Sequence, residues 1–144
     1  MNYRHIAIAG LVTMTVGCGG GGGGGGSINS FAGVWSGQLE LTTNPCGANV
    51  DPVLYPILTI NQDERHVVVE SNSGDTFEGT ATDERLSVQK TTPTDCSAGN
   101  GSATVSIDMD RHGHESSAIT ILSVSSTCGP FTCSDSYLGT VERS

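Results

Sequence analysis

The chain has 144 residues, enough for one domain, and 35% of them are hydrophobic. Six basic residues against 15 acidic ones give a net charge of −9. The basic residues form no cluster, which argues against nucleic acid as a partner. Beyond the N-terminus, no stretch of about 18 residues is apolar enough to be a membrane-spanning helix. These properties exclude classes of function, but they name no substrate.

The N-terminus has the pattern of an export signal. Arg4 and His5 form a short positive region, residues 6–16 are mainly apolar, and small residues follow. The apolar stretch is too short to cross a bilayer as a helix of the mature protein. We therefore expect it to be removed.

The end of this signal contains a more specific motif. The segment Met14-Thr-Val-Gly17-Cys18 resembles the lipobox of bacterial lipoproteins, although Thr15 replaces the preferred leucine. The resemblance implies removal of residues 1–17 and lipidation of Cys18, which would anchor the protein in a membrane. Gly19 after the cysteine, in place of aspartate, implies sorting to the outer membrane. The alternative is an ordinary secretory signal that happens to contain a cysteine.

Eight consecutive glycines, Gly19 to Gly26, follow the cysteine. Glycine has the greatest backbone freedom of any residue, so such a run does not hold one conformation. Random-coil scaling gives a reach of about 15–20 Å for a tether of this length. The expected organisation is a signal peptide (1–17), a lipidated cysteine with its tether (18–30) and one folded domain (31–144).

The folded domain is expected to be all-β, because apolar and polar residues alternate between clusters of turn-forming residues. No segment has a convincing helical period. Eight strands are expected, at residues 35–41, 54–61, 66–71, 77–81, 85–90, 103–109, 116–125 and 137–143. Closing this meander into a single up-and-down antiparallel β-barrel would remove its exposed edges.

The connections between these strands support closure. Residues 43–53, 91–102 and 126–136 are expected to be long loops, and in an up-and-down meander all three lie at the same end. The loops hold the four remaining cysteines, which in an exported domain favour two disulfides. The cysteines are Cys46, Cys96, Cys128 and Cys133.

The order of strands around the barrel favours one pairing of these cysteines. The last strand closes against the first, so the last loop lies between the other two. Cys133 is nearer the first strand and Cys128 nearer the seventh, which favours Cys46–Cys133 with Cys96–Cys128. The alternative is a local Cys128–Cys133 bond, with Cys46 joined to Cys96 across the barrel mouth.

Gly33-Val-Trp35 at the start of the first strand resembles the Gly-x-Trp signature of lipocalins and related calycin barrels. In that family, an arginine of the last strand packs over the tryptophan at the closed end of the barrel. The resemblance implies this role for Arg143, with a cation–π contact of roughly 0.5–2 kcal/mol. The domain is shorter than a typical lipocalin, and the resemblance identifies no ligand.

One group of residues has a spacing compatible with a metal site. Asp108, Asp110, His112 and His114 would share one face of an extended strand, and such ligands suit zinc or copper. The favoured interpretation is instead a solvated hairpin, because Arg111, Gly113 and Glu115 between them are typical of turns. We expect no cofactor.

The sequence predicts a non-catalytic, lipid-anchored binding protein of the bacterial envelope. No nucleophile motif or phosphate loop is present, so no enzyme activity is expected. The expected partner is a small apolar ligand or another envelope protein. The alternative is an inhibitor of a protease or of a basic hydrolase such as lysozyme, which the acidity would favour.

Overall fold

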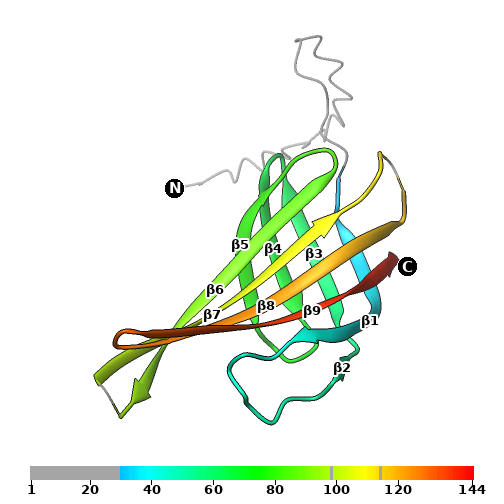
Figure 1. The fold of residues 1–144 in the computed structure, drawn as a ribbon. Coiled ribbons are helices and arrows are strands. Elements are labelled where there is room, and N and C mark those ends of the chain that lie inside the picture. Colours follow the sequence, from blue (N-terminus) through cyan, green and yellow to red (C-terminus); the bar gives the residue numbers. More distant parts are fainter. Residues whose placement is uncertain (1–29, 98, 114) are drawn as a thin grey trace, which may run out of the picture.

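The computed structural model of the protein describes residues 30–97, 99–113 and 115–144. These residues form the predicted antiparallel barrel and contain no helix (Figure 1). The strands are β1 (Gly33–Thr43), β2 (Val53–Leu54), β3 (Ile57–Asp63), β4 (His66–Ser71), β5 (Thr76–Ala81), β6 (Arg85–Cys96), β7 (Gly99–Asp110), β8 (Ser117–Cys128) and β9 (Phe131–Arg143). Each strand from β3 to β8 pairs with the next, and β1 pairs with both β3 and β9. The meander therefore closes through eight strands.

The short strand β2 is a detached part of the expected second strand. Leu54 of β2 lies opposite Leu39, and Ile57 of β3 lies opposite Ser36, so both pieces keep one register along the same edge of β1. The interruption falls at Tyr55 and Pro56. Proline has no N–H to donate to a neighbouring strand, so the ladder is broken at this position.

The prediction of long loops at residues 91–102 and 126–136 was wrong. Strands β6 and β7 pair without a break as far as Cys96 opposite Gly99, and β8 and β9 as far as Cys128 opposite Phe131. Both hairpins extend past the body of the barrel (Figure 1). We call this four-stranded extension the arm; it comprises residues 91–96, 99–104, 124–128 and 131–135.

The strands of the arm cannot be predicted from the sequence pattern, because neither face of the arm forms a hydrophobic core. Serine, threonine and glycine dominate its strands, so the apolar–polar alternation that identifies a half-buried strand is missing. Cross-strand hydroxyl pairs replace apolar contacts, for example Thr91 Oγ1 with Thr104 Oγ1 at 2.8 Å. Register is weakly specified in strands that are polar on both faces.

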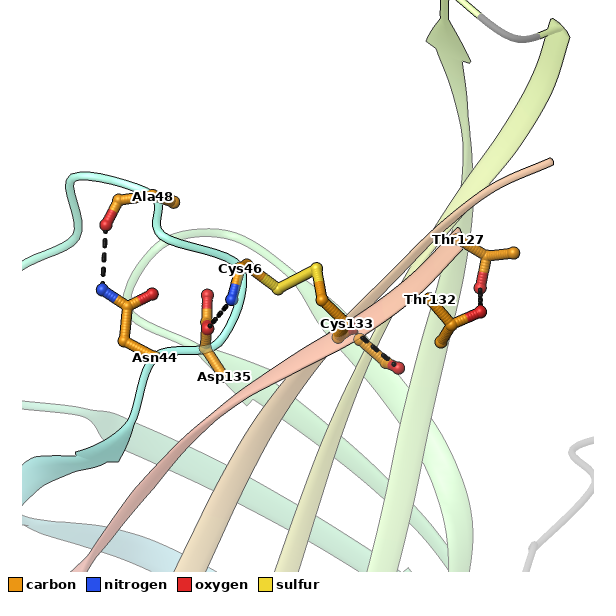
Figure 2. The surroundings of a disulfide bond; sticks show 8 residues. Asn44, Cys46, Ala48, Thr127, Thr132, Cys133 and Asp135 are labelled. Carbon is orange, nitrogen blue, oxygen red and sulfur yellow. Dashed lines mark hydrogen bonds between the residues drawn. A yellow bond between two sulfur atoms is a disulfide. The ribbon is translucent and has the colours of Figure 1, made fainter. Parts of the chain in front are cut away.

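Two disulfides tie the arm together and to the barrel. Cys96–Cys128 joins β6 to β8 at the end of the arm, and Cys46–Cys133 joins β9 to the segment between β1 and β2 (Figure 2). This is the pairing that the order of the strands favoured. The buried Asp135 supports the second bond, because its carboxylate accepts a hydrogen bond from the backbone N–H of Cys46 at 3.2 Å.

The barrel interior contains one hydrophobic cluster, whose members alternate with outward-facing residues along the strands. Most of the apolar residues that the strand period places on the inward face are buried, whereas Val105 packs against the cluster as a half-buried residue. The buried ones include Leu39, Val67, Phe77, Leu86, Ile107 and Tyr137. Burial of such side chains contributes about 1.5–3 kcal/mol each to folding. The sequence period of two therefore identified the inward face correctly.

Candidate functional site

The two ends of the barrel differ, and one of them is closed by aromatic and cationic side chains. Trp35 is completely buried there and lies opposite Arg143 in the register of β1 with β9. The Arg143 Cζ atom is 5.5 Å from the centre of the Trp35 ring, within the range of a cation–π contact. The indole N–H donates to the carbonyl of Phe31 at 2.7 Å.

A second arginine, which the sequence interpretation assigned to a turn, completes this closed end. Arg111 is only 4% exposed, and its Cζ atom lies 3.9 Å from the centre of the Phe31 ring. The guanidinium groups of Arg111 and Arg143 both donate to the carbonyl of Ser30, at 3.0 and 3.2 Å. Burial, and then the charge of Arg143, lowers the pKa of Arg111. These contacts fix residues 30–31 across the barrel end.

The opposite end contains the candidate binding site, a solvent-open cavity of about 300 Å³. Its apolar lining comes from Leu54 of β2, from Tyr55 and Pro56 of the β2–β3 connection, and from inward-facing residues of four longer strands, Leu58, Phe77, Val105, Ile107 and Leu122. Ligand sites typically have volumes of about 300–1,000 Å³ and mainly apolar walls. The cavity is thus of a size for a small apolar molecule.

A polar rim lies beside this apolar lining. It comes from the β4–β5 turn, through Ser71, Asn72, Ser73 and Asp75. The Asp75 carboxylate accepts hydrogen bonds from Lys90 Nζ at 2.6 Å and from the Ser73 hydroxyl at 3.0 Å. The hydrogen bond from Lys90 is the main cause that lowers the pKa of Asp75. An ionised carboxylate therefore stands at the cavity mouth.

The structure does not gather the described members of the candidate metal ligands, Asp108, Asp110 and His112, into a site. Asp108 and Asp110 lie on the outer face of β7, where Asp108 accepts from the Ser87 hydroxyl at 2.6 Å and Asp110 pairs with Arg85 at 2.7 Å. Strand β7 ends at Asp110, His112 is exposed in the turn that follows, and His114 lies outside the described residues. Among the described residues, no three His, Cys, Asp or Glu side chains converge.

Cys18, the expected lipidation site, and the glycine tether also lie outside the described residues. Within the described ranges there is no helix that could span a membrane.

Comparison with known proteins gives no family for this chain. No protein family model matches it, and no curated protein or solved structure shows significant similarity to it. The geometry of the cavity and its surroundings is therefore the feature of this protein that indicates a function.

Proposed function

We propose that the protein is a lipid-anchored binding protein of the bacterial envelope that holds a small apolar ligand in the open end of its barrel. The observation that carries this proposal is the cavity of about 300 Å³ lined by Leu58, Phe77 and Ile107. Apolar walls with a few polar groups at the rim are typical of sites that bind small molecules.

The position of the cavity is compatible with attachment of the protein to a membrane through its N-terminus. Residue 30 lies at the closed end, where its carbonyl is held by Arg111 and Arg143. The cavity opens at the other end, beside the β4–β5 turn and the β2–β3 connection. A lipid on Cys18 would therefore hold the closed end toward the membrane and leave the mouth accessible.

The resemblance to lipocalins agrees with this proposal. The contact of Arg143 with Trp35 and the closure of the barrel through eight strands support this resemblance. The resemblance identifies no ligand, so the apolar lining of the cavity is what supports an apolar ligand.

Binding of a neutral fluorescent probe, N-phenyl-1-naphthylamine, tests the proposal. The protein used contains the tether and residues 31–144. We expect saturable binding with increased fluorescence as the probe leaves water for the cavity. Leu122→Trp, which adds bulk to the cavity wall, should weaken binding about tenfold, equivalent to about 1.4 kcal/mol. Thr59→Trp, at an exposed position on the outside of β3, should not change it.

An absence of saturable binding, or equal binding by the Leu122→Trp and Thr59→Trp variants, would exclude the cavity as a binding site. If the probe does bind in the cavity, native mass spectrometry of the protein purified from its own host will show whether a natural ligand co-purifies with it.

A further inference from the structure

The outside of the barrel carries an aliphatic surface that the cavity does not involve. Ile119 and Ile121 of β8 and Leu138 of β9 are 56%, 41% and 44% exposed. Ile121 lies directly opposite Leu138, and residues opposite each other in antiparallel strands have neighbouring side chains on one face. Ile119 and Leu138 also line a shallow hollow with Gln38 and Glu40. We call Ile119, Ile121 and Leu138 the outer aliphatic face.

Carboxylates border this face on both sides. Glu40 of β1 lies opposite Leu138, Asp108 of β7 lies opposite Ile121, and Asp110 lies opposite Ile119. Arg85, which pairs with Asp110, is the nearby cation. Strands β1, β8 and β9 contain no lysine, and Arg143, their one arginine, points to the closed end of the barrel. The face is thus apolar at its centre and negative at its borders.

We propose that the outer aliphatic face docks a cationic amphipathic segment of another protein, with apolar side chains on Ile119, Ile121 and Leu138 and lysine or arginine beside the carboxylates. Complementary charge on the rim of an interface increases the association rate and selects partners. Three exposed aliphatic side chains make a small contact, so the complex is expected to be transient.

Two other occupants fit less well. A second copy packed symmetrically on this face would bring Glu40, Asp108 and Asp110 toward the same carboxylates of its partner, and like charges in an interface are unfavourable. An anionic membrane surface would be repelled by the same groups. A cationic partner is the occupant that uses both the apolar centre and the negative border.

A labelled helical peptide of leucine and lysine, with its leucines on one face, tests the proposal by fluorescence anisotropy. We expect saturable binding that weakens as salt is added, because the bordering carboxylates are exposed. Ile121→Ser combined with Leu138→Ser should reduce affinity about tenfold at every salt concentration. Glu40→Gln combined with Asp108→Asn should instead flatten the salt dependence.

Matched controls separate this face from general effects. Ile57→Ser removes an equally exposed aliphatic side chain from β3 and should not change binding. Leu122→Trp should also leave peptide binding unchanged, which distinguishes the outer face from the cavity. Circular dichroism melting curves of each variant establish that it is folded.

Three results would overturn the proposal. A scrambled peptide of the same composition could bind as well, showing that net charge alone is responsible. The Ile121→Ser, Leu138→Ser variant could bind the peptide as the wild type does. Sedimentation could show a dimer that this variant abolishes, which would make a second copy the occupant.

Discussion

Three inward-facing glycines set the path of the barrel strands where a side chain would not fit. A Cβ atom built on Gly37 would overlap the carbonyl oxygen of Thr140, and one on Gly139 would overlap that of Gln38. Gly79 has the same relation to Ser87 on the other side of the barrel. Strand interiors usually disfavour glycine, so these positions mark close approach of neighbouring backbones. Two of the three, Gly37 and Gly139, lie at the seam where β9 closes on β1.

Gly139→Ala should therefore destabilise the protein, because the nearest atoms belong to backbone and cannot rotate away. Overpacking of this kind lowers the free energy of unfolding by about 1–3 kcal/mol or more. Urea denaturation followed by tryptophan fluorescence measures it, since Trp35 lies in the same strand pair. Thr140→Ala, at the exposed neighbouring position, is the control and should change stability by less than about 0.5 kcal/mol. An unchanged urea midpoint for Gly139→Ala would contradict the packing described here.

At the scale of elements, the arm and the barrel body are stabilised differently. The body has a hydrophobic cluster that includes Leu58, Val69 and Val88, all almost completely buried. The arm has hydroxyl pairs and disulfides in place of such a core. Local opening is easier where few apolar contacts hold an element. The disulfides are therefore expected to matter more to the arm than to the body.

Replacing Cys96 and Cys128 together by serine tests this difference. The bond spans 32 residues of sequence, and the chain-entropy account assigns a loop of that length roughly 3–4 kcal/mol of stabilisation. We expect faster amide hydrogen exchange in the arm and unchanged protection in β3, β4 and β5, measured under conditions where the body stays folded. Replacing Cys46 and Cys133 by serine should instead increase amide hydrogen exchange in residues 44–52 and in β2. Uniform loss of protection in either variant would show that arm and body unfold as one unit.

At the scale of the whole molecule, the two proposed binding surfaces lie away from residue 30, where the expected tether ends. Arg111, Arg143 and Phe31 hold residue 30 at the closed end. The cavity opens at the other end, and the outer aliphatic face lies on the side of β8 and β9. An anchor at Cys18 would leave both surfaces accessible, with a tether of about 15–20 Å between membrane and domain.

Cys18→Ser tests the anchor in the native host. We expect the wild type to incorporate a radiolabelled fatty acid and to fractionate with membranes, because we propose that Cys18 carries a lipid. The variant should remain an unprocessed or mislocalised precursor. A Cys46→Ser variant is the matched control, since it removes a cysteine of the folded domain and should keep the label. A wild-type protein that takes up no label would contradict the lipoprotein assignment.

The sequence by itself determined which side chains of each strand face inward, and it determined the all-β class of the fold. Val67, Phe77 and Ile107 face inward as expected, because a residue's side of a sheet follows from the backbone period of two. Closure of an eight-stranded meander also favoured the pairing Cys46–Cys133 with Cys96–Cys128, because strand order fixes which loops are neighbours. The contact of Trp35 with Arg143 followed from the same closure together with the lipocalin resemblance.

Only the tertiary structure decided where the barrel is filled and where it is hollow. Leu86 and Leu122 both point inward, yet Leu86 is in the filled core and Leu122 lines the cavity, because depth along the barrel depends on register and strand tilt. The sequence predicts only a turn at Arg111, because its contacts with Phe31 and Ser30 join segments about 80 residues apart and have no local sequence signal. The arm could not be predicted because its strands are polar on both faces and therefore show no hydrophobic period in the sequence. Its strand pairing is seen only in the tertiary structure.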